Sequence, residues 1–317
     1  MKLWLRALWL GLCISLLWMG LSGLAEAEKV TLNLQFPEGR KARYKNTHRI
    51  EYFSNQAELI ISMEGSMRMS IDSQWRSTEE IQKPEPEPME EIPEGILAVK
   101  ALVEKGSGKA VFLGEMQTWE QFPFTVDMLN GRSFIWRIEP TGKVIQFDPD
   151  FQAHKVERQD MVTDAFLYWM PEYSLVLPDY PVDKGDTWTG ELTLERPFAS
   201  MDLMGKTAGV TFKSTYKVKK IKKKKGRIEV SIDEERELKE YRCWIDIRSA
   251  SLYVAGSGKG KCEWVIDATR GVVLSSKSRM TLDEPMVMKA GRGGPIPNIS
   301  AEVVIHFERK LEKLEKE

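Results

Sequence analysis

The sequence predicts a mainly β fold of two tandem antiparallel β-sheet halves, each shaped like a half-barrel, with one helix between them. Three features predict it: runs of alternating apolar and polar residues, turn signals between those runs, and a motif that recurs in the second half. Of the 317 residues, 42% are hydrophobic and 29% are charged. That composition is ordinary for a globular chain and supplies enough apolar side chains for a buried core.

Residues 1–27 are expected to be an export signal. Lys2 and Arg6 precede an uncharged apolar run at 7–24, and the small-x-small sequence Ala25-Glu26-Ala27 follows as a cleavage site. The alternative is an uncleaved anchor, because the run approaches the ~20 residues that span a bilayer. In both cases the rest of the chain is exported, so we expect a periplasmic or extracellular protein.

Residues 28–150 form the first predicted β half. From residue 61 to residue 75 most odd-numbered positions are apolar and the even-numbered ones are polar, the period of a strand with one buried face. Residues 83–95 begin with alternating prolines and glutamates and predict an exposed, extended loop. Asn130-Gly131 separates two strand-like runs and predicts a tight hairpin, since both turn positions need a positive φ.

Residues 151–187 are predicted to form a helix and a linker. Apolar residues recur there at three- and four-residue steps: Val162, Ala165, Phe166 and Trp169. Pro171 ends this run, so a helix is expected at 162–169. In the stretch that follows, two prolines keep the chain extended and Gly185 permits a tight turn before the next strand.

Residues 188–317 are predicted to form a second β half that repeats the first. The clearest match aligns WRIEPTGKV at 136–144 with WVIDATRGVV at 264–273, with one residue inserted before the second glycine. Both segments have the pattern of a strand, a turn and a strand. We therefore interpret the chain as a duplicated β-domain.

Cys243 and Cys262 are the two cysteines that follow the export signal. An exported protein folds where disulfides form, and the strand pattern allows both thiols to point into one core. A bridge between them is expected. The alternative is two unpaired, buried cysteines that pack as small apolar side chains.

The charge and histidine patterns give no support to a nucleic-acid, metal or cofactor site. The formal charge is -1, from 46 basic and 47 acidic residues, so no whole-chain field favours a polyanion. His48, His154 and His306 have no partner at metal-ligand spacing, and His48 is expected to face the interior. Residues 219–225 contain six lysines, which predict a solvated hairpin tip. The alternative is a contact with phosphate or anionic lipid.

Two motifs carry a family resemblance: LPDYPVDKGDTW at 177–188 and CEWVIDATRGVV at 262–273. With the export signal and the paired β halves, they resemble uncharacterised exported bacterial proteins of duplicated β-architecture. More remotely, the expected curved sheet and covering helix resemble the half-barrel of lipoprotein carriers. The resemblance to carriers implies an apolar concave face with a helix as its lid.

We expect a non-catalytic binding protein that holds an apolar or lipid ligand between a sheet and the helix, with no metal and no cofactor. The expected lining consists of Met63, Met67, Met69, Phe166 and Trp169. Unbranched methionines adapt to ligands of different shapes, although ordinary core packing explains them equally well. The alternatives are an interaction protein of the envelope without a small ligand, and an enzyme, which would need converging carboxylates in a polar cleft.

Overall fold

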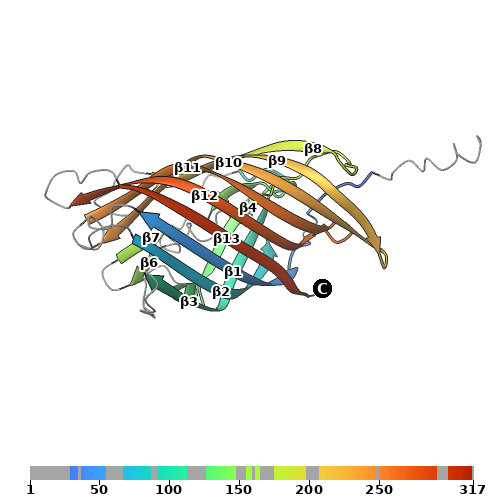
Figure 1. The fold of residues 1–317 in the computed structure, drawn as a ribbon. Helices are drawn as coiled ribbons and strands as arrows, with labels where there is room; N and C mark the ends of the chain where they lie inside the picture. The colour runs from blue at the N-terminus through green and yellow to red at the C-terminus, as the bar shows by residue number, and fades with distance from the viewer. Residues whose placement is uncertain are drawn as a thin grey trace, which may run out of the picture.

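Among the residues that it describes, the computed structural model is mainly β (Figure 1), which confirms the predicted fold class at that level. It describes residues 29–34, 37–54, 67–86, 91–112, 126–147, 155–158, 161–164, 175–197, 207–247, 250–290 and 299–315. Among these residues, no helix is long and apolar enough to cross a membrane. The strands are β1 (Lys41–Ser54), β2 (Met67–Gln82), β3 (Leu97–Phe112), β4 (Ser133–Ile138), β5 (Val144–Phe147), β6 (Lys155–Arg158), β7 (Met161–Asp164), β8 (Thr187–Pro197), β9 (Thr207–Lys224), β10 (Arg227–Ile247), β11 (Ala250–Asp267), β12 (Val272–Ala290) and β13 (Ile299–Leu314).

The 13 strands of the described residues belong to one antiparallel sheet. The order is β5-β4-β3-β2-β1-β13-β12-β11-β10-β7-β6, and β9 lies between β10 and β8. The last strand of the chain therefore pairs with the first, and β1 continues the sheet directly into β13. Two tandem halves were the wrong expectation, because alternation along a strand shows which face is buried but not which strands pair.

The prediction of a helix at 162–169 is wrong for residues 162–164, the part that the structure describes. Met161–Asp164 form strand β7, which pairs with β6 and with the end of β10 through Val162 and Asp246. The β-branched side chains of Val162 and Thr163 suit a strand, and the neighbouring backbone supplies the hydrogen bonds. Residues 165–174 lie outside the described residues.

The turn at Asn130-Gly131 is not the expected two-residue hairpin. A short 3-10 helix, η1 (Val126–Leu129), precedes it, and only Gly131 of the pair has a positive φ, at 77°. The Asn130 side chain instead holds the backbone of Gly106 through both its amide oxygen and its amide nitrogen. By contrast, the two matched motifs do form strand, turn and strand, as β4–β5 and β11–β12.

The sheet curls until side chains from its distant strands share one core (Figure 1). Trp136 of β4 and Val144 of β5 belong to the same buried cluster as Leu192 of β8 and Phe212 of β9. Between these two edges the Leu177 amide donates to the Thr141 carbonyl at 2.8 Å. Curling hides the inner face of a single sheet from water without a second layer.

A second buried cluster closes one end of the curled sheet. Residues 29–34 and 175–182 pass across this end, where Val30 and Val182 exchange backbone hydrogen bonds of 2.8 and 2.9 Å. Trp188 stacks on Tyr216 with ring centroids 5.3 Å apart, and its indole nitrogen donates to the Val176 carbonyl at 2.8 Å. The LPDYPVDKGDTW stretch thus forms part of an end closure.

Gly142 is essential to this closure. Its φ is +84°, and an added Cβ would lie 2.6 Å from Leu34 Cδ1 and 3.1 Å from the Leu175 carbonyl oxygen. Gly131 has a similar φ of +77° but nothing within 4 Å of an added Cβ. The two glycines therefore share a backbone requirement and differ in the space around them.

We predict that Gly142→Ala lowers the free energy of unfolding by about 3 kcal/mol, from the left-handed backbone and from overpacking together. Gly131→Ala, the matched control, should lower it by about 1–2 kcal/mol, from the backbone alone. Urea unfolding of both variants measures the difference. Equal losses in the two variants would show that crowding between the added Cβ at position 142 and Leu34 does not contribute to the loss of stability.

The predicted bridge between Cys243 and Cys262 is wrong, since Cys262 is a free, buried cysteine. Cys262 lies opposite Glu234, whereas Cys243 lies opposite Val254, eight positions further along β11. Eight strand residues span ~26 Å, and bridged cysteines need Cα atoms within ~7 Å. Burial raises the pKa of the Cys262 thiol well above its ordinary value, so it packs as a neutral side chain.

A buried ion pair lies between the two apolar clusters. Glu234 accepts hydrogen bonds from Arg236, from the Ser214 hydroxyl at 2.6 Å and from the Trp264 indole at 2.7 Å. Burial alone would lower the pKa of Arg236, but the Glu234 carboxylate outweighs it and holds that pKa above its ordinary value. The Arg236 guanidinium also lies 4.9 Å from the Phe212 ring centroid, so the pair contacts both clusters.

We predict that Glu234→Leu destabilises the protein by about 3–5 kcal/mol, because it leaves the Arg236 cation buried without its counter-charge. The double variant Glu234→Leu/Arg236→Met should recover much of this loss, since apolar pairs of similar volume often replace buried ion pairs. Denaturant midpoints of the three proteins test this. A double variant as unstable as the single one would mean that the hydrogen bonds to Ser214 and Trp264 dominate.

Candidate functional site

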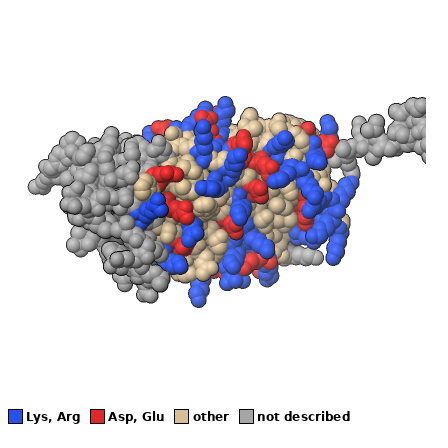
Figure 2. All heavy atoms as spheres, in the orientation of Figure 1, with Lys and Arg blue, Asp and Glu red and all other residues tan. Residues whose placement is uncertain are grey.

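The outer face of the sheet is densely charged (Figure 2). Residues that alternate with the buried ones point outward, and many are Lys, Arg, Asp or Glu. On β1 and β13, for example, His48 and Phe307 are buried whereas the neighbouring Arg49 and Glu308 are exposed. A candidate binding site lies on this face.

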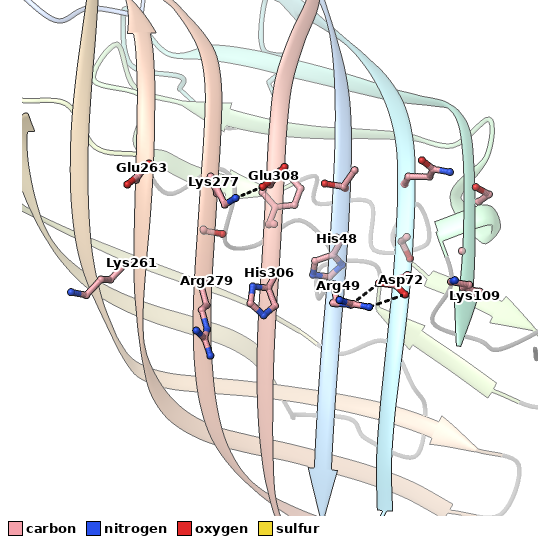
Figure 3. A pocket seen from close by; sticks show the side chains of 17 residues that line it. His48, Arg49, Asp72, Lys109, Lys261, Glu263, Lys277, Arg279, His306 and Glu308 are labelled. Carbon is pink, nitrogen blue, oxygen red and sulfur yellow. Dashed lines mark hydrogen bonds and ion pairs between the residues drawn. The ribbon is translucent and has the colours of Figure 1, made fainter. Parts of the chain in front are cut away.

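The site is a groove of about 970 Å³ that crosses β11, β12, β13, β1, β2 and β3 (Figure 3). Strand register arranges its outward side chains in two rows. The cationic row contains, in strand order, Lys261, Arg279, His306, Arg49, Asp72 and Lys109. The mixed row contains, in the same order, Glu263, Lys277, Glu308, Thr47, Gln74 and Ser107.

The floor of the groove is formed by the residues between the two rows. Ser278, Phe307, His48 and Ser73 have buried side chains that point inward, so their backbone faces the groove. Rows two residues apart are separated by ~7 Å, and five gaps between six strands span ~24 Å. The groove is therefore long and narrow, and it runs across the strands.

The cationic row places basic residues directly opposite one another. Lys261 faces Arg279, Arg279 faces His306, and His306 faces Arg49. Lys261 and Arg279 are like charges directly opposite each other on neighbouring strands, and such a pair destabilises a sheet. This arrangement is therefore favourable only where anionic groups balance it.

Acidic side chains balance the cationic row only in part. Arg49 pairs with Asp72 at 2.8 Å, and Lys261 pairs with Glu235 at 3.3 Å. Glu51 lies 3.9 Å from the His306 Nε2 atom and 4.0 Å from the Arg49 Nε atom. Among the described residues, Arg279 and Lys109 form no ion pair. The lining contains five basic side chains, which are Arg49, Lys109, Lys261, Lys277 and Arg279, and three acidic ones, which are Asp72, Glu263 and Glu308. With both histidines neutral, the difference of five and three gives a net charge of +2.

The backbone of His48 forms part of the floor, and its side chain lies buried beneath it, which confirms the predicted interior position. Its ring makes edge-on contacts with Trp75 and Phe307, at centroid distances of 6.4 and 6.3 Å. Burial, with a smaller contribution from His306, lowers the pKa of His48 from 6.5 to about 4. His48 is therefore neutral at neutral pH and part of the packing.

We predict that stability falls as the pH drops from about 6.5 to about 4, because His48 takes up a proton in the unfolded chain before it does so in the folded one. The full shift corresponds to about 3 kcal/mol. His48→Leu should remove this part of the acid sensitivity, whereas His306→Gln, a control on the surface, should keep it. Urea unfolding as a function of pH measures the slopes, and an unchanged slope in His48→Leu would contradict the prediction.

Neither of the described residues of the predicted apolar lining, Met67 and Met69, lines this groove. Met63, Phe166 and Trp169 lie outside the described residues. Met67 and Met69 belong to β2, where Met69 pairs with Tyr52 and Phe112. The predicted apolar lining therefore stays a prediction.

The groove itself was missed by sequence reasoning. Each polar position that contributes to it was recognisable from alternation within its own strand. The row appears only when β1, β13 and β12 are aligned in register, and these strands come from opposite ends of the chain. In the described part of the chain, no cluster of three or more His, Cys, Asp or Glu side chains could hold a metal ion.

No protein-family model matches the chain, and no curated protein matches it. Among solved structures, OccK9 (OpdG) from Pseudomonas aeruginosa aligns with 86% of this chain and 98% of its own, at 5% identity and a TM-score of 0.21. OccD3 (OpdP) from the same species aligns with 90% of this chain and 95% of its own, at 8% identity and a TM-score of 0.20. A mutant of Rh. blastica porin aligns with 84% of this chain and 99% of its own, at 7% identity and a TM-score of 0.18. Scores this low carry no argument about this chain.

Proposed function

We propose that this protein is an exported, non-catalytic binding protein whose outer groove holds an extended anionic ligand. The observation that carries the proposal is the cationic row, in which Lys261, Arg279, His306 and Arg49 face one another in register. An anionic ligand would supply the counter-charge that Arg279 and Lys109 do not receive from the described residues. Export, to the periplasm or the cell exterior, rests on the N-terminal signal.

The length of the groove favours an extended ligand over a compact one. Arg279 on β12 and Lys109 on β3 are four strand gaps apart, or ~19 Å at the ordinary spacing of strands. A single phosphate or carboxylate reaches one of these two cations. A chain of linked anionic groups reaches both, and each further contact adds affinity without a new association step.

The acidic residues of the groove support binding over catalysis. Asp72 pairs with Arg49, Glu263 lies 3.5 Å from the Lys219 ammonium, and Glu308 pairs with Lys277. A general acid or base needs a carboxyl group that is free to reach the reacting atoms. Each of these three carboxylates is engaged by a neighbouring cation, and we assign them to positioning basic side chains.

We predict that Arg279→Gln/Lys109→Gln weakens binding of long-chain inorganic polyphosphate by about tenfold or more at low salt. The matched control is Lys213→Gln/Lys217→Gln, which neutralises two exposed lysines on β9, a strand that the groove does not reach. Titration calorimetry with each variant measures the affinities. An equal loss in the control would point to a diffuse surface attraction, and unchanged binding in Arg279→Gln/Lys109→Gln would exclude the groove.

Ligand length provides a second test. Orthophosphate should bind the wild-type protein much more weakly than polyphosphate does, because a single phosphate cannot contact Arg279 and Lys109 at the same time. For the same reason, Arg279→Gln should weaken orthophosphate binding no more than Lys109→Gln does. Competition between the two anions, followed by the same calorimetry, gives the ratio. Equal affinity per molecule for the short and long anions would contradict an extended site.

The apolar ligand expected from the sequence remains a separate hypothesis. A search for co-purified lipid by mass spectrometry tests it directly. Bound lipid would support that hypothesis, whatever the groove binds.

A further inference from the structure

A second row of basic residues lies on the outer face, beyond the edge of the groove. It crosses β13, β1, β2 and β3, four strands that lie side by side (Figure 1). Register places its members directly opposite one another, in the strand order Lys310, Lys45, Arg76 and Lys105. All four side chains are exposed, and none of them lines the groove. These four residues form the second cationic row.

Acidic side chains balance the second cationic row at one position. Glu312 pairs with Arg76 at 2.9 Å. Among the described residues, Lys45, Lys105 and Lys310 form no ion pair. Each neighbouring pair in the row therefore places like charges opposite each other, which destabilises a sheet. A bound polyanion would offset that repulsion.

Neutral polar side chains separate the two cationic rows on three of the strands. They are the neutral part of the mixed row, Thr47 on β1, Gln74 on β2 and Ser107 on β3, and register places them opposite one another. Hydroxyl and amide groups both donate and accept hydrogen bonds. In the part of the chain that the structure describes, none of these three side chains hydrogen-bonds another residue. All three are therefore available to a ligand.

A ligand that contacts both cationic rows must also cover the neutral residues between them. Arg49 and Lys45 on β1 are four residues apart, or ~14 Å at the rise of an antiparallel strand, and Thr47 lies midway. A bare polyphosphate chain offers mainly acceptor oxygens to the neutral residues. A ligand with hydroxyl groups offers donors as well, and so uses the acceptors of Thr47 and Gln74 too.

Acidic side chains on the same face also favour a ligand that carries hydrogen-bond donors. Asp72 and Glu308 line the groove, and Glu312 lies beside the second cationic row. A carboxylate accepts hydrogen bonds at both oxygens, and a single neighbouring cation does not occupy every lone pair. Phosphate oxygens are acceptors and repel these carboxylates. Sugar hydroxyls donate to carboxylates and accept from lysine and arginine.

We propose that the ligand of this face is an acidic polysaccharide. Its anionic groups contact the two cationic rows, and its hydroxyl groups contact Thr47, Gln74 and Ser107 between them. This inference rests on the proposed function, in which the groove holds an extended anionic ligand, and it names the chemistry of that ligand. A nucleic acid is also a polyanion, but it meets a protein mainly through phosphate oxygens, which do not donate.

The test is titration calorimetry with polygalacturonate, a polysaccharide that has one carboxylate on each sugar. Dextran has the hydroxyl groups without the charge, and long-chain polyphosphate has the charge without the sugars. At low salt we expect polygalacturonate to bind at least about tenfold more tightly than dextran. Lys45→Gln/Lys105→Gln should weaken polygalacturonate binding by about tenfold or more. The matched control Lys213→Gln/Lys217→Gln, on β9, should keep it.

A second variant tests the neutral residues. Thr47→Val/Gln74→Met removes two hydrogen-bonding groups and nearly preserves the size of each side chain. It should weaken polygalacturonate binding by about tenfold, as the loss of two hydrogen bonds predicts, and polyphosphate binding by less than about twofold. Melting temperatures of the variants show whether the fold is intact.

Three results would overturn the polysaccharide and leave the proposed function in place, because polyphosphate binding that depends on Arg279 and Lys109 tests that function separately. The first is a loss in Lys45→Gln/Lys105→Gln no larger than in the control. The second is an equal loss of both polyanions in Thr47→Val/Gln74→Met. The third is tighter binding of duplex DNA than of polygalacturonate, lost in Lys45→Gln/Lys105→Gln, which would make the partner a nucleic acid. Binding of neither polyanion, or equal binding of dextran, would overturn the proposed function as well.

Discussion

Burial of one face of a single continuous sheet is the constraint on which the other features depend. Successive side chains of a strand point to opposite faces, so a slip of one residue would expose the whole inner set. Trp75, Tyr216, Trp264 and Phe307 must therefore stay inward, each in its own strand. The buried side chains therefore also fix the register of the outward residues next to them, including the residues that line the groove. The cationic row is thus a consequence of how the core packs.

Buried polar side chains make this register specific. Glu79 pairs with Arg309 across β1, and the Arg309 guanidinium lies 3.6 Å from the centroid of the Tyr44 ring between them. Burial raises the pKa of Tyr44 to about 12, and its hydroxyl donates to the Val273 carbonyl on β12. A slip of two residues would keep the same face of a strand inward, but it would leave a buried charge without its partner, which costs several kcal/mol. The pairs Glu79–Arg309 and Glu234–Arg236 therefore penalise any other alignment of their strands.

Sequence reasoning reached the features that depend on local pattern. The alternation around residues 61–75 correctly indicated that Ile71 and Trp75 face inward on β2, and the repeated motif correctly indicated two strand-turn-strand units. It failed where distant segments decide the outcome. The pairing of β1 with β13, the distance between Cys243 and Cys262, and the strand at Met161–Asp164 all depend on contacts that local periodicity does not contain. The groove needs five such alignments at once, one for each pair of neighbouring strands.

The formal charge of -1 hides two basic surfaces, the face that carries the cationic rows and the tip of the β9–β10 hairpin at residues 220–227. Along β11, Lys261 of the cationic row lies six residues, or ~20 Å, from Asp267 at the end of the strand, and the two surfaces meet where Glu263 of the groove pairs with Lys219. Charges at physiological ionic strength are screened over ~8 Å, so acidic residues far from these surfaces do not cancel them. Whole-chain neutrality excluded a single dominant field, as the composition indicated. It did not exclude the uneven distribution that register and hairpin geometry create.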